Sequence, residues 1–125
     1  MGNAFASRPL YFVVDDEIDI AKLLVVILQM NLFDAVPFAD PREALEAAKV
    51  GAPDYLISDI VMPEMTGIEL AISIRRDMPD CKVLLFSGKL GALELIQKAE
   101  KSGHNLHLLE KPVHPTKLIE AMRAL

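Results

Sequence analysis

The stretch DIVMPEMTG, residues 59–67, joins a short β-rich apolar run at 55–58 to a run with helical spacing at 67–77. An aspartate directly after a strand-like run, followed by a proline-containing turn and then a helix, is typical of a strand-loop-helix unit. In an open α/β sheet, the carboxyl ends of parallel strands form the edge at which ligands bind. The stretch therefore predicts an α/β fold and places Asp59 at its ligand-binding edge.

The same alternation of strand and helix continues along the whole chain. Asp40 is the expected N-cap of the second helix, Thr66 leads the third, and Pro41 and Pro115 suit first helical positions. Five strands alternating with five helices predict right-handed crossovers and a parallel sheet covered by helices on both faces. The expected strands span residues 10–14, 35–39, 55–58, 82–86 and 106–109, and the expected helices span 17–30, 41–50, 67–77, 90–101 and 115–125.

Length and composition favour one globular domain. The chain has 125 residues, of which 52% are hydrophobic and 25% charged, enough to bury roughly two thirds of the unfolded surface. We expect a single domain over 1–125, with about residues 1–8 as an N-terminal extension, and no room for a second domain. The net charge of −5 gives no basic surface for direct nucleic-acid binding.

Cysteine content and hydropathy indicate the compartment. The one cysteine, Cys81, excludes an intramolecular disulfide and suits a reducing cytosol. Residues 1–9 lack the pattern of a signal peptide, and the longest apolar run, 23–28, is too short to span a bilayer. We therefore expect a soluble, cytoplasmic protein without membrane insertion.

Polar residues follow four different strand-like runs: Asp15-Asp16, Asp59, Ser87 and Lys111-Pro112. A parallel sheet would bring all of them to one edge. Three carboxylates with a hydroxyl and an ammonium can hold a hard divalent cation, offer a carboxylate to a phosphoryl group and neutralise the arriving charge. Each residue alone has an ordinary interpretation, such as a capping aspartate or a surface lysine. Their convergence favours a phosphate-handling site.

The motifs VVDDE at 13–17, DIVMPEMTG at 59–67, FSG at 86–88 and EKP at 110–112 match a known family in order and position. Over nearly its whole length, the chain resembles the receiver domain of two-component response regulators, in particular stand-alone, chemotaxis-regulator-like receivers. The resemblance implies a flavodoxin-like, doubly wound sheet with strand order 2-1-3-4-5. It also implies an aspartate that takes a phosphoryl group from a histidine kinase or phosphotransfer protein.

The resemblance implies roles for the acidic residues. Asp59 would be the phosphoacceptor, Asp16 would bind Mg²⁺ directly, and Asp15 would act partly through water. With the backbone carbonyl of Val61, these carboxylates suffice for Mg²⁺, which keeps several waters. The alternative for Asp15 and Asp16 is a solvated pair favoured by a helix N-terminus.

Ser87 and Lys111 complete the implied site. The hydroxyl would donate to a phosphoryl oxygen, and the ammonium would place a point charge on the same group. The resemblance also implies a cis peptide bond before Pro112, which is accessible at modest cost only before proline. Gly88 would let the backbone approach closely.

One departure from the family pattern concerns signal output. The resemblance implies an aromatic residue three positions before the lysine, whose rotamer reports phosphorylation, but this position is Leu108. We therefore expect the response to centre on residues 87–93, with little change at 106–109. Because an apolar Val61 cannot orient an attacking water, we also expect a long-lived acyl phosphate.

The histidines lie near this departure. Compared with the receiver domains that the chain resembles, the segment 103–108, which leads into the fifth strand, is about one residue longer, and it contains His104 and His107. An H-x-x-H pair is a fragment of a metal site, but without a third ligand exposed loop histidines are the simpler interpretation. His114 precedes Pro115 at an expected N-cap.

The first predicted helix is apolar beyond the needs of one core stripe. We assign Ile20, Leu23, Leu24 and Ile27 to the core, while Ala21, Val25, Val26 and Leu28 extend the apolar surface. The resemblance implies that this helix docks on the helical hairpin of a kinase or phosphotransfer protein. The alternative is a helix covered by its neighbours.

Two other functions compete with a phosphoacceptor receiver. The domain could bind partners independently of phosphorylation, as Leu108 allows. It could also be a Mg²⁺-dependent phosphohydrolase, but that class predicts D-x-D at the nucleophile, where Asp59 is followed by Ile60-Val61. We expect no enzyme beyond catalysis of its own phosphoryl transfer and dephosphorylation. The sequence fits a stand-alone receiver or the input domain of a longer regulator.

Overall fold

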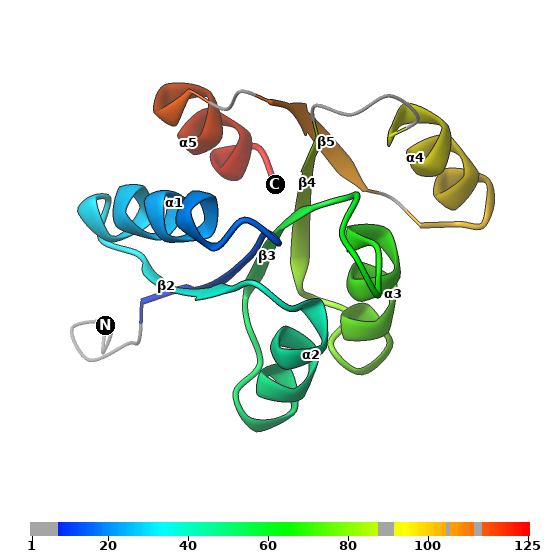
Figure 1. Ribbon diagram of the computed structural model, residues 1–125, viewed down its shortest axis with the longest axis horizontal. Helices are drawn as coiled ribbons and strands as arrows, with labels where there is room; N and C mark the ends of the chain where they lie inside the picture. The colour runs from blue at the N-terminus through cyan, green and yellow to red at the C-terminus, as the bar shows by residue number, and fades with distance from the viewer. Residues whose placement is uncertain (1–7, 88–91, 105, 112–113) are drawn as a thin grey trace, which may run out of the picture.

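The computed structural model describes residues 8–87, 92–104, 106–111 and 114–125. All paired strands are parallel and form one sheet in the order β2-β1-β3-β4-β5 (Figure 1). The predicted fold class and strand order are confirmed. The elements are β1 Leu10–Val14, α1 Ile18–Met30, β2 Asp34–Phe38, α2 Pro41–Val50, β3 Tyr55–Asp59, α3 Gly67–Asp77, β4 Lys82–Ser87, α4 Ala92–Lys101, β5 His107–Glu110 and α5 Pro115–Arg123.

Helices cover both faces of the sheet. Helices α1 and α5 pack on one face, and α2, α3 and α4 pack on the other (Figure 1). Side chains of the central strands alternate between the two cores: Ile57 and Leu84 face α1 and α5, whereas Leu56 and Leu85 face the other layer. Burial on both faces explains why these strands are continuous apolar runs in the sequence.

The predicted starts of α2, α3 and α5 are confirmed by their caps. The carboxylate of Asp40 accepts a hydrogen bond from the backbone N–H of Arg42 at 2.9 Å. Thr66 and Glu69 form a capping box, in which each side chain accepts from the other residue's backbone N–H. The imidazole of His114 accepts from the N–H of Thr116 at 3.3 Å, as expected for an N-cap.

Some predicted boundaries differ from the structure. Strand β2 begins and ends one residue earlier than predicted, and α5 ends at Arg123. Glu17 stands at the N-cap of α1 rather than inside the helix, and its side chain makes no capping bond. The predicted roles of Gly88 and of the peptide bond before Pro112 lie outside the described residues. Within the described residues, no helix is both long enough and apolar enough to cross a membrane.

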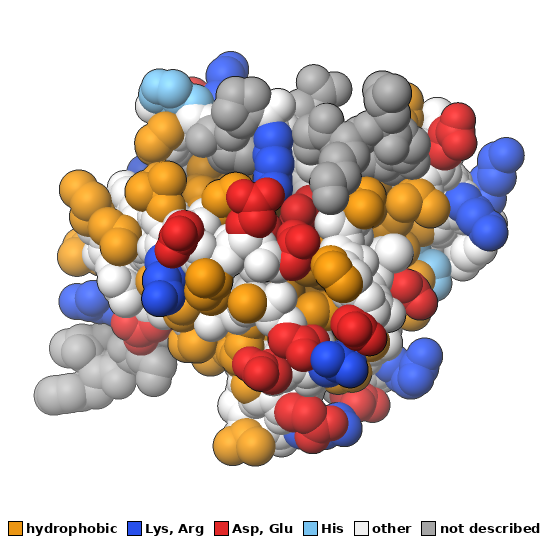
Figure 2. Space-filling model, viewed as in Figure 1, with side chains coloured by type: hydrophobic (Ala, Val, Ile, Leu, Met, Phe, Trp, Pro, Cys, Tyr) orange, Lys and Arg blue, Asp and Glu red, His pale blue; other side chains and the backbone are white. Residues whose placement is uncertain are grey.

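The predicted core stripe of α1 is wrong at Leu23, whose exposed fraction is 61%. The buried residues are Ala21, Leu24, Val25 and Leu28, spaced i, i+3, i+4, i+7. Because α1 is apolar on most sides, its sequence does not decide which side meets the sheet. The rotation of the helix leaves an exposed apolar stripe of Leu23, Val26 and Met30, and Figure 2 shows hydrophobic side chains gathered over α1.

Candidate functional site

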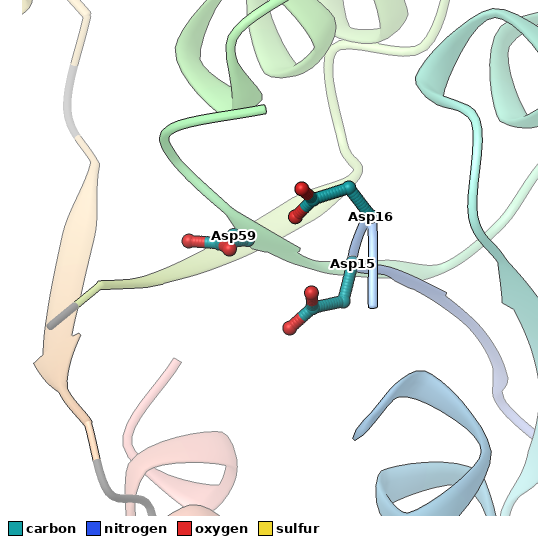
Figure 3. A group of neighbouring side chains, drawn as sticks. All are labelled: Asp15, Asp16 and Asp59. Carbon is teal, nitrogen blue, oxygen red and sulfur yellow. The ribbon is translucent and has the colours of Figure 1, made fainter. Parts of the chain in front are cut away.

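Three carboxylates meet at the carboxyl ends of β1 and β3, which are neighbours in the sheet. One oxygen from each of Asp15, Asp16 and Asp59 lies within 4.8 Å of the others. Figure 3 shows the three side chains projecting from these strand ends into the same space. Asp15 and Asp59 are buried, whereas Asp16 is exposed. The predicted convergence of the acidic residues is confirmed.

Adjacent residues reach one site because the chain leaves the strand at this point. The N–H of Asp15 donates to the carbonyl of Phe38 at 3.0 Å, which continues the contact with the β2 side. The N–H of Glu17 then donates to the Asp15 carboxylate at 2.9 Å. This turn between β1 and α1 lets Asp15 and Asp16 reach the same space, which an extended strand would not allow.

Lys111 bridges two of the carboxylates. Its Nζ lies 3.1 Å from Oδ2 of Asp15 and 3.2 Å from Oδ2 of Asp59. The ammonium also lies 5.0 Å from the ring centroid of Phe86, a cation–π contact. With all four groups ionised, three carboxylates and one ammonium give this group a net charge of −2. Acidic side chains gather beside a basic one near the centre of the face in Figure 2.

Burial and charge shift the protonation of this group. Burial raises the pKa of the Asp15 carboxyl above its ordinary value, and the Asp59 carboxylate adds to the increase; the Glu17 N–H and Lys111 oppose it only in part. Burial alone would lower the pKa of Lys111, but its bonds and charge interactions with Asp15 and Asp59 raise it. The Lys111 ammonium therefore stays charged at neutral pH. Its charge compensates only in part for the burial of the Asp15 carboxyl, whose pKa stays above its ordinary value.

The donor set suits a hard divalent cation. Carboxylate oxygens are the ligands that Mg²⁺ prefers, and it normally takes one or two of them and keeps several waters. Of the three carboxylates, that of Asp16 is exposed to solvent. Among the described residues, Asp15, Asp16 and Asp59 form the one group of three potential ligands this close together. His104 and His107 belong to no such group, and His107 lies on β5 instead of in a loop.

The other predicted site residues lie at the same edge or directly after it. Ser87 ends β4 and is buried, and its carbonyl accepts a hydrogen bond from the N–H of Lys111 at 3.3 Å. Val61 follows Asp59 by two residues, and its partly buried side chain packs against the core under α2, α3 and α4. The following loop contains Glu64, whose φ of 71° is left-handed and whose carboxylate lies 3.6 Å from Arg42.

The sequence of residues 11–123 matches the response regulator receiver domain family. The chain belongs to this family. It is 31% identical to the chemotaxis protein CheY of Thermotoga maritima over 88% of the chain and 91% of that protein. It is 28% identical to the DNA-binding response regulator MtrA of Mycobacterium tuberculosis over 94% of the chain, but spans about half of MtrA (50%). The solved chemotaxis protein CheY4 of Vibrio cholerae superposes with a TM-score of 0.83 at 27% identity, covering 94% of this chain and 98% of that one.

Leu108 stands three positions before Lys111, where the resemblance of the sequence to receiver domains leads us to expect an aromatic residue. This side chain is partly buried and packs against the core on the α2, α3 and α4 side, beside Leu85 of β4. A leucine held in this core has no ring to move between an inner and an outer position. The predicted response region, 87–93, includes residues 88–91, which lie outside the described residues.

Two contacts of the site have no local sequence signal. Phe86 lies under the Lys111 ammonium, and the buried Ser58 hydroxyl donates to the backbone carbonyl of Asp59 at 2.8 Å. Both residues belong to apolar strand segments. Phe86 begins the FSG motif, but that motif does not indicate a contact with Lys111, and Ser58 lies outside the four motifs. Only the register that pairs Asp59 with Phe86, and the strand end that follows, give them a role.

Proposed function

We propose that this receiver domain is a phosphoacceptor in a two-component or phosphorelay system, and that Asp59 takes a phosphoryl group from a phosphohistidine. The observation that carries the proposal is the shared ammonium: Lys111 contacts both Asp15 and Asp59, with Asp16 beside them. A nucleophilic carboxylate, a set of oxygen ligands and a neutralising cation thus occupy one strand edge, as phosphoryl transfer requires.

In the proposed reaction, an oxygen of the Asp59 carboxylate attacks phosphorus. An O–P bond forms, the P–N bond to the histidine breaks, and the released imidazole takes up a proton from solvent. The Nζ of Lys111 lies 3.2 Å from the attacking carboxylate, so its positive charge can stabilise the phosphoryl oxygens once the group is bound to Asp59. The Ser87 hydroxyl would donate to one of these oxygens. The domain would catalyse only its own phosphoryl transfer and dephosphorylation, without an external substrate.

Asp15, Asp16 and Asp59 would hold Mg²⁺, with the backbone carbonyl of Val61 as a further ligand. The two negative charges that Lys111 leaves uncompensated support this assignment. When bound, the cation would neutralise charge on the phosphoryl oxygens. Lys111 and Ser87 would contact the phosphoryl group from the β4 and β5 side of the site.

We assign partner docking to the exposed stripe of α1. Leu23 and Met30 are 61% and 77% exposed, and Val26 between them is 50% exposed. An apolar stripe on a helix suits packing against the helical hairpin of a histidine kinase or phosphotransfer protein. The output partner would respond to the phosphorylated state. The net charge of −5 argues against direct nucleic-acid contact by this domain.

Intact mass after incubation with acetyl phosphate and Mg²⁺ tests the proposal. We expect the mass of one phosphoryl group on the wild-type domain and none on Asp59→Asn. Asp80→Asn is the control, because Asp80 is an exposed aspartate near the opposite end of β4 and should leave the adduct intact. An adduct on Asp59→Asn would refute the assignment of the phosphoacceptor. No adduct on the wild type would favour a phosphorylation-independent interaction module.

A further inference from the structure

Ser58 is a polar residue at a position where the strand pattern calls for an apolar one. Leu56 on β3 and Ile60 directly after the strand are fully buried in the core under α2, α3 and α4, and Ser58 lies between them in the alternation. Its side chain has an exposed fraction of 0%. A buried hydroxyl is costly unless it is hydrogen-bonded. Here Oγ of Ser58 donates to the backbone carbonyl of Asp59 at 2.8 Å.

The first residue of α3 packs against the same peptide group. A Cβ placed on Gly67 would lie 2.1 Å from the carbonyl oxygen of Asp59 and 3.0 Å from Oγ of Ser58. Only glycine permits an approach this close. The N–H of Gly67 also donates to the carbonyl of Ile60 at 2.8 Å. Helix α3 therefore begins directly on the backbone that carries Asp59.

Three hydrogen bonds hold consecutive peptide groups after Asp59. Ser58 binds the carbonyl of Asp59, and Gly67 binds the carbonyl of Ile60. Between them, the N–H of Ile60 donates to the carbonyl of Phe86 at 3.2 Å. These bonds fix the backbone on the carboxyl side of Asp59. They thereby set the direction in which its side chain leaves the strand and the path of the chain toward Val61.

We propose that Ser58 is a positioning residue for phosphoryl transfer, which holds the Asp59 backbone so that the carboxylate is aligned for in-line attack. This inference rests on the proposed phosphoacceptor function of Asp59. The competing explanation is that Ser58 is small only to admit Gly67, in which case alanine would serve equally well. The two explanations differ in what the hydroxyl contributes, so removing that single oxygen separates them.

The test compares Ser58→Ala with the wild-type domain. The rate of acyl phosphate formation is measured with acetyl phosphate at saturating Mg²⁺, over a range of donor concentrations. We expect the rate at high donor to fall roughly tenfold, the factor that corresponds to about 1.4 kcal/mol. The donor concentration for half-maximal rate should change little, because Ser58 does not face the donor.

Ile74→Val is the control for lost stability. Ile74 is buried in the same core on α3, and removing one methylene there destabilises the fold without touching the Asp59 peptide. All rates are measured well below the melting temperatures of the variants. Ser58→Cys is a second variant that keeps the space filled with a weak donor. It should resemble Ser58→Ala, and it carries the test if the alanine variant does not fold.

An unchanged rate in Ser58→Ala would overturn the positioning role, as would an equal loss of rate in Ile74→Val at an equal loss of stability. Either result leaves the proposed function intact, since the wild-type domain still forms its adduct. A wild-type domain that takes up no phosphoryl group would instead overturn the proposed function and this inference with it.

Discussion

Asp16→Asn should stabilise the metal-free receiver domain. The three carboxylates lie within 4.8 Å of one another, and two unit charges at that distance repel by about 0.9 kcal/mol in water-like surroundings. This dielectric is appropriate because Asp16 is exposed. Asp16 has two such neighbours, and we count about one net repulsion because the Lys111 ammonium, 3.1 Å from Asp15 and 3.2 Å from Asp59, offsets part of their charge. The substitution should therefore raise the free energy of unfolding by about 1 kcal/mol at low ionic strength, or the melting temperature by about 4 °C.

Mg²⁺ should remove this advantage. Binding stabilises the wild-type domain by about 2.7 kcal/mol when the free Mg²⁺ concentration is 100 times the dissociation constant. If Asp16 is a direct ligand, its loss should weaken binding about tenfold or more, which costs about 1.4 kcal/mol of that stabilisation. The variant should thus melt above the wild type in EDTA, and no higher than the wild type in millimolar Mg²⁺.

Thermal melts in EDTA and in Mg²⁺, each at low and moderate salt, measure both effects. Asp80→Asn removes an exposed aspartate far from the site and should change neither melt. Salt should shrink the gain in EDTA because ions screen the repulsion between the carboxylates. It should not abolish the gain, because charges only a few ångströms apart are screened only in part. A variant that melts below the wild type in EDTA, or that gains as much from Mg²⁺, would refute the electrostatic reasoning.

Three further predictions follow from burial and exposure. Burial raises the pKa of Cys81 to about 11, so a thiol reagent at pH 8 should label the native domain far more slowly than the urea-unfolded chain. Because the folded pKa of Asp15 is raised, the folded state binds a proton more readily than the unfolded state. The metal-free domain should therefore gain stability as the pH falls through the raised pKa of Asp15 toward the unfolded value, in urea melts at several pH values, while Mg²⁺ stabilisation shrinks. Leu23→Asp should slow phosphorylation by a cognate kinase about tenfold and leave acetyl phosphate labelling unchanged; Val50→Asp, at an exposed position on α2, should affect neither.

The order of elements and the location of the site follow from local sequence signals. Capping residues such as Asp40 and Thr66 and the strand-like runs act over a few residues, so the sequence alone predicts the helices and strands to within one or two residues at most boundaries. Parallel alternation then brings the strand ends to one edge, which makes Asp15, Asp59 and Lys111 predictable neighbours. The motif at 59–67 indicates the family because its residues are consecutive in the sequence and can be recognised without knowledge of the fold.

Contacts between distant segments were decided by the tertiary structure alone. The side of α1 that meets the sheet depends on how the helix rotates against its neighbours, and an apolar surface on most sides leaves that rotation open in the sequence. The bond between Lys111 and Asp15 joins residues 96 positions apart, so its geometry exists only once the sheet register is set. The same holds for Ser58: its hydroxyl finds the Asp59 carbonyl, and Gly67 packs against both, because β3 ends there and α3 returns to cover it.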